Sequence, residues 1–100
     1  MVKHIILWTL KEMSEEEKIA VKAGIKSGLE GLKGKIPGLL EIKVVTEGRL
    51  ESSTADLMLD STFESSDALK AYSKHPDHVK VADEKVRPFT ASRACLDFEV

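Results

Sequence analysis

The fold is decided by the first apolar segment of the chain, Val2-Lys3-His4-Ile5-Ile6-Leu7-Trp8-Thr9-Leu10. Its β-branched, aliphatic and aromatic residues are typical of a β-strand. Because side chains alternate along a strand, one face carries Val2, His4, Ile6, Trp8 and Leu10. The other face carries Lys3, Ile5, Leu7 and Thr9. The middle of the strand is therefore apolar on both faces, and a single layer of helices covers only one of them.

A helix is predicted directly after this strand. Ser14 and Glu17 have the spacing of a capping box, in which each side chain binds a free N–H group at the helix start. An apolar face then recurs at three-and-four spacing, with Val21, Ile25, Leu29, Leu32 and Ile36. Gly34, Pro37 and Gly38 end the helix.

A stripe of small residues runs beside that face, formed by Ala20, Gly24, Gly28 and Gly31. A glycine inside a helix costs about 1 kcal/mol of stability relative to alanine. Several of them together predict that a neighbour approaches this side closely. That neighbour is a strand, the second helix or a ligand.

Three further strands are predicted from their apolar patterns, at Leu39–Val45, Asp56–Phe63 and Ser92–Val100. A second helix begins at Ser65 or Ser66, restarts at Pro76 and ends at Arg87-Pro88. In the last strand we expect Ala94, Leu96 and Phe98 to point inward. Arg93, Asp97 and Glu99 are expected to point outward.

The predicted order is β-α-β-β-α-β, which is an α+β fold of the ferredoxin-like sandwich type. It has a four-stranded antiparallel sheet with two helices on one face. The open face would present an apolar patch formed by Ile5, Leu7, Met58, and Leu40 or its neighbours. We therefore predict a homodimer in which two sheets pack face to face as a dimeric α+β barrel.

Composition limits the possible classes of protein. One hundred residues with 42% hydrophobic and 32% charged side chains indicate one domain, residues 1–100. Since the net charge is −2 and the two signs are interspersed, no nucleic acid or membrane partner is expected. The single Cys95 cannot form an internal disulfide, and the apolar run near Ile5 is too short for a membrane span or signal peptide. The expected location is the cytoplasm.

Candidate chemistry is concentrated in Tyr72-Ser73-Lys74-His75-Pro76-Asp77-His78, which holds the only tyrosine and two of three histidines. Proline suits the first helical turn, so His75 is predicted to cap a new helix. The positive end of the helix dipole disfavours an imidazolium, so His78 should be neutral and able to accept a proton. The alternative is structural, because a His-Pro pair is also a plain way to end one helix and start another.

An ordered set of motifs runs along nearly the whole chain: Met1-Val2-Lys3-His4, Ile36-Pro37-Gly38, Ser61-Thr62-Phe63-Glu64, Tyr72 with His75-Pro76-Asp77-His78, and Val86-Arg87-Pro88. In these motifs the chain resembles the stress-responsive A/B barrel family. The resemblance implies a ferredoxin-like fold that dimerises through its sheets. Many members of this family have no assigned reaction, whereas a plant polyketide cyclase branch catalyses an intramolecular aldol condensation without a cofactor.

The resemblance to that branch implies roles for Tyr72, His78 and His4. His78 would remove a proton between two carbonyls, Tyr72 would donate a hydrogen bond to the enolate oxygen, and His4 would orient the substrate or His78. The positions that match the aromatic pocket walls of the branch are Ile25 and Leu29. Trp8 either fills the core or lines the pocket. The full expected binding set is His4, Ile6, Trp8, Ile25, Leu29 and His75.

Three functional hypotheses follow. The first is a small dimeric protein whose pocket, between sheet and helices, binds a hydrophobic or carbonyl-bearing small molecule. The second is a cofactor-independent lyase or cyclase, and the third is a purely structural stress-response protein, which requires no solvent path to His78. His75 and His78 with His4 or Asp77 could meet a cation, but Cys95 is expected on a distant strand without a cysteine partner. We expect no metal and no cofactor.

Overall fold

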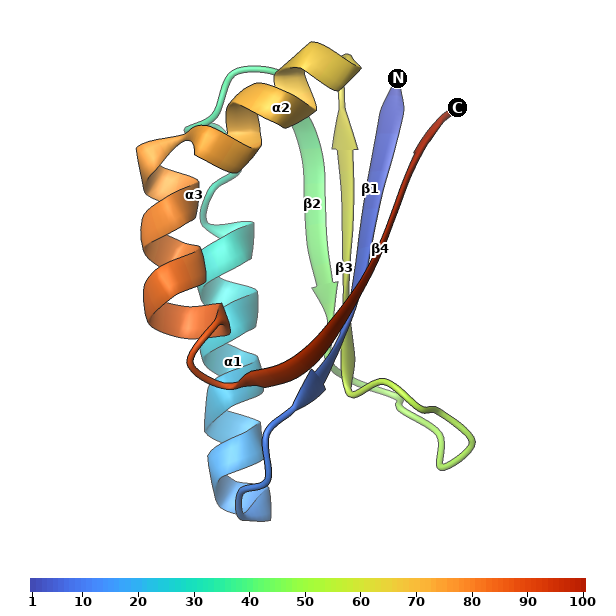
Figure 1. Cartoon of the computed structure of the whole chain (residues 1–100), viewed down its shortest axis with the longest axis vertical. Coiled ribbons are helices and arrows are strands. Elements are labelled where there is room, and N and C mark those ends of the chain that lie inside the picture. The colour runs from blue at the N-terminus through green and yellow to red at the C-terminus, as the bar shows by residue number, and fades with distance from the viewer.

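The computed structural model describes residues 1–100 and contains four strands and three helices. The strands are β1 (Val2–Leu10), β2 (Leu39–Val45), β3 (Leu57–Phe63) and β4 (Thr90–Glu99). The helices are α1 (Glu15–Glu30), α2 (Ser66–Lys74) and α3 (Pro76–Val81), and α3 continues into a π-helical turn, η1 (Ala82–Val86). The helices form one layer beside the sheet, whose other face is uncovered (Figure 1).

The sheet has the order β2-β3-β1-β4, and all of its neighbouring strands are antiparallel. The predicted ferredoxin-like α+β fold is confirmed. β1 is a central strand, and it turns His4, Ile6 and Trp8 toward the helix layer and Ile5 and Leu7 toward the open face. None of the helices is both long enough and apolar enough to cross a membrane.

The core lies between the sheet and the helix layer. Its deepest members come from both sides, with Ile25 of α1, Val44 of β2 and Phe63 of β3 all fully buried. Half of the predicted capping box is present: Ser14 Oγ accepts from the Glu17 N–H at 3.1 Å, whereas the Glu17 carboxylate accepts from the Ser14 hydroxyl at 3.1 Å. Ser65 Oγ caps α2 in the same way, accepting from the Ala68 N–H at 3.1 Å.

The neighbour of the small-residue stripe is the second helical segment. A Cβ atom placed on Gly28 would lie 2.9 Å from Val81 Cγ1, and one on Gly24 would lie 3.9 Å from Lys85 Cδ. Of the three neighbours expected from the sequence, the structure therefore selects the helix. The glycines let α1 approach α3 and η1 closely.

The predicted orientation of β4 is wrong. Its apolar side chains do not point into the core between the sheet and the helices. Asp97 pairs with His4, Cys95 with Ile6 and Arg93 with Trp8, and directly opposed residues of an antiparallel pair share a face. The polar side chains of β4 thus face the helix layer. Leu96 and Phe98 lie on the open face, where they are 62% and 41% exposed.

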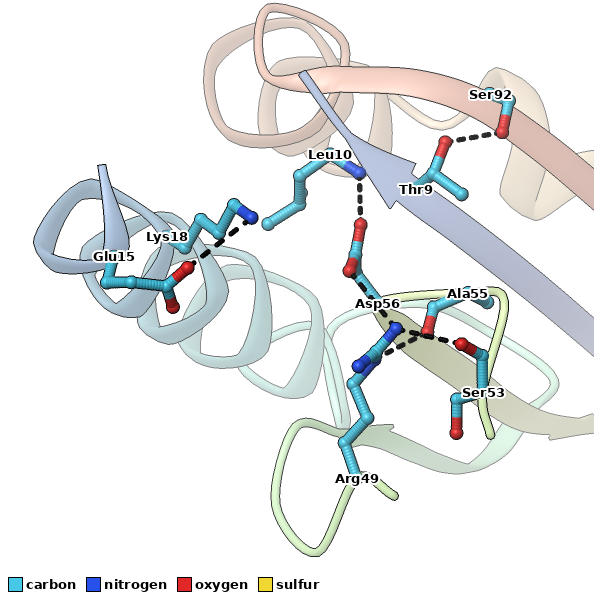
Figure 2. A network of polar contacts seen from close by, with 9 residues as sticks. All are labelled: Thr9, Leu10, Glu15, Lys18, Arg49, Ser53, Ala55, Asp56 and Ser92. Atoms are coloured by element: carbon cyan, nitrogen blue, oxygen red, sulfur yellow. Dashed lines mark hydrogen bonds and ion pairs between the residues drawn. The ribbon is translucent and has the colours of Figure 1, made fainter. Parts of the chain in front are cut away.

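Asp56 fixes the corner where β1 ends and β3 begins (Figure 2). Its carboxylate accepts from the Leu10 N–H at 2.7 Å. Arg49 closes the loop before β3 by donating to the carbonyls of Ala55, at 2.8 Å, and Ser53, at 3.0 Å. This network stabilises the end of the sheet that carries the β2–β3 loop.

Candidate functional site

A cavity of about 380 Å³ lies on the helix side of the sheet. Its wall includes six of the residues expected in the site, namely His4, Ile6, Trp8, Leu29, Tyr72 and His78. β1 contributes three of them, and α1, α2 and α3 contribute one each. Trp8 takes both of its expected places, because it belongs to the hydrophobic core and also lines the cavity.

Two expected binding residues do not line this cavity. Ile25 is fully buried within the hydrophobic core. His75 caps α3, where its Nδ1 accepts from the Asp77 N–H at 3.1 Å. The structural role proposed for the His-Pro pair therefore applies to His75, while His78 reaches the cavity.

Tyr72 and His78 form the polar centre of the cavity wall. Their ring centroids lie 4.2 Å apart, with 38° between the ring planes. Tyr72 Oη and His78 Nδ1 are buried, and neither has a hydrogen-bond partner on the protein. Most buried polar groups in folded proteins are paired, so two unpaired atoms on neighbouring rings of the cavity wall require an explanation.

Burial sets the protonation states of both groups. It lowers the pKa of His78, and the positive charges of Arg87, His4 and Arg93 act in the same direction, while the backbone of Ser73 opposes them. The expected direction is confirmed, but its main cause is burial. Burial also raises the pKa of Tyr72, so near neutral pH a protonated phenol faces a neutral imidazole.

His4 is held by a partner on the neighbouring strand. Its Nδ1 forms a hydrogen-bonded pair with the Asp97 carboxylate, and its ring packs edge-on to Tyr72 with the centroids 6.2 Å apart. The sequence led us to expect that His4 orients the substrate or His78. Because Asp97 occupies Nδ1, the imidazole has only Nε2 for any such contact.

Several residues of the site were not predicted. Ser73, Arg87, Thr90 and Arg93 line the cavity, and Asp97 orients His4. The sequence places Arg87 at a helix end and within a family motif, without a role in the site, and it predicts that Arg93 and Asp97 point outward. The residues of β4 were missed because the sequence does not show the register of that strand. Pairing with β1 turns the polar side chains of β4 toward the helices.

One cluster in this region has ligand atoms suited to a cation. His4 Nδ1, Cys95 Sγ and an Asp97 oxygen lie within 4.8 Å of one another. The expectation that Cys95 lies far from other ligands is wrong, because its Sγ is 3.8 Å from His4 Nδ1. Burial and the Asp97 carboxylate raise the pKa of Cys95. The cluster is satisfied by its own hydrogen bonds, including Cys95 Sγ to Asp97 Oδ1 at 3.5 Å.

A surface groove adjoins the cavity between α2 and β4. Four residues border both spaces: His4, Leu69, Ser73 and Arg93. The groove continues past Cys95 and Asp97 to Glu99. The cavity therefore meets the surface beside the exposed edge strand of the sheet.

Comparison with known proteins gives one family and a consistent fold. The family model described as the stress responsive A/B barrel domain matches residues 2–100. The chain is 30% identical over 99 residues to a stress-response A/B barrel domain-containing protein of Arabidopsis thaliana. The match covers 98% of this chain but only 36% of that relative.

Solved structures agree with this assignment. A dimeric protein of unknown function with a ferredoxin-like fold from Bacteroides fragilis is 34% identical, with a TM-score of 0.91. The match covers 99% of this chain and 95% of that one. The hydroxynitrile lyase of Passiflora edulis is 20% identical with a TM-score of 0.71, over 97% and 90% of the two chains. At that identity the likeness concerns the fold.

Proposed function

Because the chain belongs to the stress-responsive A/B barrel domain family, we propose that its cavity binds a hydrophobic small molecule that carries a carbonyl group. Binding cavities for small molecules usually occupy about 300–1,000 Å³ and combine apolar walls with a few convergent polar groups. The cavity described above has that size and that composition. A dry apolar cavity of about 150 Å³ already admits benzene.

The observation that carries the proposal is the pair of unpaired atoms, Tyr72 Oη and His78 Nδ1. An unsatisfied buried polar group costs about 1–3 kcal/mol. A ligand that offers an acceptor to the phenol recovers part of this cost, while its apolar body contacts Leu29 and Trp8. The missing hydrogen bonds thus favour a ligand with one polar group, and a carbonyl oxygen suits a phenol donor.

A lyase or cyclase reaction is the second candidate, and the protonation states favour it. The neutral His78 takes a proton from the carbon beside a carbonyl, the C–H electron pair moves toward oxygen, and Tyr72 donates a hydrogen bond to the resulting enolate. This step needs no metal or redox partner. The Passiflora edulis hydroxynitrile lyase has the same fold, so the fold is compatible with a reaction of this broad type.

The purely structural hypothesis is less well supported. It requires that His78 have no access to solvent, whereas His78 borders a cavity that meets a surface groove. A protein whose only role is assembly has no need to keep a phenol and an imidazole unpaired.

We also propose that the chain forms a homodimer through its sheet faces. Leu7, Leu96 and Phe98 are exposed on the open face, and contiguous apolar surface of this kind marks an interaction site. The relative from Bacteroides fragilis is described as dimeric. A second copy would cover the apolar face that the helices leave open.

Thermal shift with two probes tests the proposed binding. Benzoylacetone carries two carbonyls, whereas butylbenzene has a similar size and none. We expect benzoylacetone to raise the melting temperature of the wild type, and butylbenzene to raise it less. His78→Ala should lose most of the benzoylacetone shift. His75→Ala is the matched control, because it removes an imidazole that lies outside the cavity wall.

Equal benzoylacetone shifts in the wild type and His78→Ala would show that His78 is not in the binding site. For the lyase candidate, benzylacetone in D₂O is the sharper probe. Exchange of the hydrogens beside its carbonyl, followed by NMR, should be faster with the wild type than with His78→Ala. Equal rates would contradict a role for His78 as a base.

A further inference from the structure

We propose that the mouth of the cavity contains an anion-binding subsite centred on Arg93, so that the bound molecule is an apolar carboxylic acid in its ionised form. This inference rests on the proposed function, because it assigns a charge to the molecule that the cavity is proposed to bind. A ligand that only offers a carbonyl group to Tyr72 needs no such charge.

The cavity wall has an unusual charge composition for this chain. The protein has 17 acidic and 15 basic residues and a net charge of −2. The cavity wall nevertheless contains two arginines, Arg87 and Arg93, and no aspartate or glutamate. A concave surface lined by charge of one sign raises the local concentration of the opposite charge. The wall therefore favours an anion although the chain as a whole is slightly acidic.

The two arginines are not equivalent. Arg87 forms an ion pair with Asp83 one helical turn earlier, so a carboxylate of the protein already balances its charge. Arg93 takes part in none of the ion pairs of the protein. Its guanidinium contacts the Cys95 thiol through a side-chain hydrogen bond, but a guanidinium has five N–H donors, so donors remain in the fork geometry that matches a carboxylate. The unbalanced charge of the wall is thus that of Arg93.

The position of Arg93 fixes the orientation of the ligand. Arg93 pairs with Trp8 across the β1–β4 ladder, and it borders both the cavity and the adjoining groove. The opposite part of the wall includes Leu29 and Leu59, which are 2% and 1% exposed. The carboxylate therefore lies at the mouth, where water still reaches it, and the apolar body lies within.

The rest of the groove is unsuited to an anion. Beyond Arg93 it is lined by Asp97 and Glu99 of β4 and by one further cation, Lys70 of α2, and the two carboxylates repel a ligand of the same charge. Asp97 is also held by His4. The subsite is therefore centred on Arg93, the arginine that borders both the cavity and the groove. A longer ligand cannot extend its charged group along β4.

The test uses two probes that differ only in charge, phenylbutyrate and its amide, phenylbutyramide. Trp8 is the only tryptophan and lines the cavity, so its fluorescence reports binding of either probe directly. We expect the wild type to bind phenylbutyrate about tenfold more tightly than phenylbutyramide, as a charge-assisted hydrogen bond allows. Arg93→Gln should remove this preference by weakening only phenylbutyrate, and Arg93→Lys should restore part of it.

Lys80→Gln is the matched control. It also removes one positive charge, but from an exposed position on α3 outside the cavity wall, and it should keep the preference for phenylbutyrate. A preference that survives in Arg93→Gln would overturn the assignment to Arg93. Equal affinity of the wild type for both probes would overturn the subsite and leave binding by the cavity intact. If neither probe changed the Trp8 signal at millimolar concentration, the proposed function itself would fail, and the subsite with it.

Discussion

The rings of Tyr72 and His78 lie 4.2 Å apart, and each carries a buried polar atom that no other group of the protein satisfies. The two residues belong to different helices, which meet at the cap formed by His75. Protein interiors rarely contain two such atoms side by side. The arrangement costs the folded protein stability, and under the proposed function it supplies hydrogen-bond partners for a ligand.

Tyr72→Phe removes only the unpaired hydroxyl. Because that hydroxyl has no partner on the protein, the free energy of unfolding should not fall, and it should rise by up to about 1 kcal/mol. Urea denaturation measures it. Ser61→Ala is the control, since the buried Ser61 hydroxyl donates to the His4 carbonyl at 3.0 Å, and its loss should cost about 1 kcal/mol. Equal losses in both variants would mean that the Tyr72 hydroxyl is satisfied.

His78 should make the stability of the protein depend on pH. Burial lowers its pKa below the ordinary value of 6.5. Between the folded and unfolded pKa values, the unfolded chain binds more protons, so the free energy of unfolding falls as pH falls below about 6.5. Urea denaturation between pH 7 and pH 5 should show a shallower decline in His78→Gln than in the wild type. Identical slopes would indicate that His78 stays solvated in the folded protein.

Two glycines of α1 should respond oppositely to alanine. At Gly24 the added Cβ meets Lys85 Cδ at 3.9 Å, so Gly24→Ala should stabilise the protein by up to about 1 kcal/mol through helix propensity. At Gly28 the Cβ would lie 2.9 Å from Val81 Cγ1, and overpacking costs about 1–3 kcal/mol. Thermal denaturation of both variants should therefore give shifts of opposite sign. Two shifts of the same sign would contradict the close approach of α3.

The proposed dimer depends on the open sheet face. Leu7→Glu places a charge at the centre of that face, and sedimentation velocity should show a monomer at concentrations where the wild type is a dimer. Ile19→Glu is the control, because Ile19 is also an exposed apolar residue but lies on α1 and not on the open face of the sheet. A wild type that sediments as a monomer at micromolar concentration would refute the dimer.

The sequence predicted the element order well because each element carries its own local signal. The alternation of β1, the Ser14 capping box and the restart at Pro76 are properties of neighbouring residues. The apolar character of both faces of β1 also indicated that a single layer of helices leaves one face uncovered. These signals suffice for a ferredoxin-like fold, since few topologies connect such elements in this order.

The prediction failed where a contact depends on register between distant strands. Arg93, Asp97 and Glu99 were assigned to the wrong face because the apolar residues between them were assumed to point toward the helices. In the structure those apolar residues face the side expected to be covered by a second copy. A strand that is apolar on one face does not reveal which of two possible cores that face joins.

The site was predicted only in part, because local motifs identify some of its residues but not the way they pack. Tyr72, His78 and His4 were found through a local motif and a family resemblance, and Ile25 was wrongly expected to line the cavity rather than the core. Burial, which lowers the pKa of His78, is a property of the assembled tertiary structure. A sequence motif can place the imidazole at a helix start, but it cannot show how much water reaches it.

The most direct test of the central claim is the affinity of benzoylacetone for the wild type and for Tyr72→Phe, each titrated by Trp8 fluorescence, with butylbenzene as the reference probe. If Tyr72 Oη donates to a ligand carbonyl, Tyr72→Phe should weaken benzoylacetone about three- to tenfold and leave butylbenzene unchanged. Equal affinity of benzoylacetone for both proteins would contradict a carbonyl-binding role for the Tyr72–His78 pair.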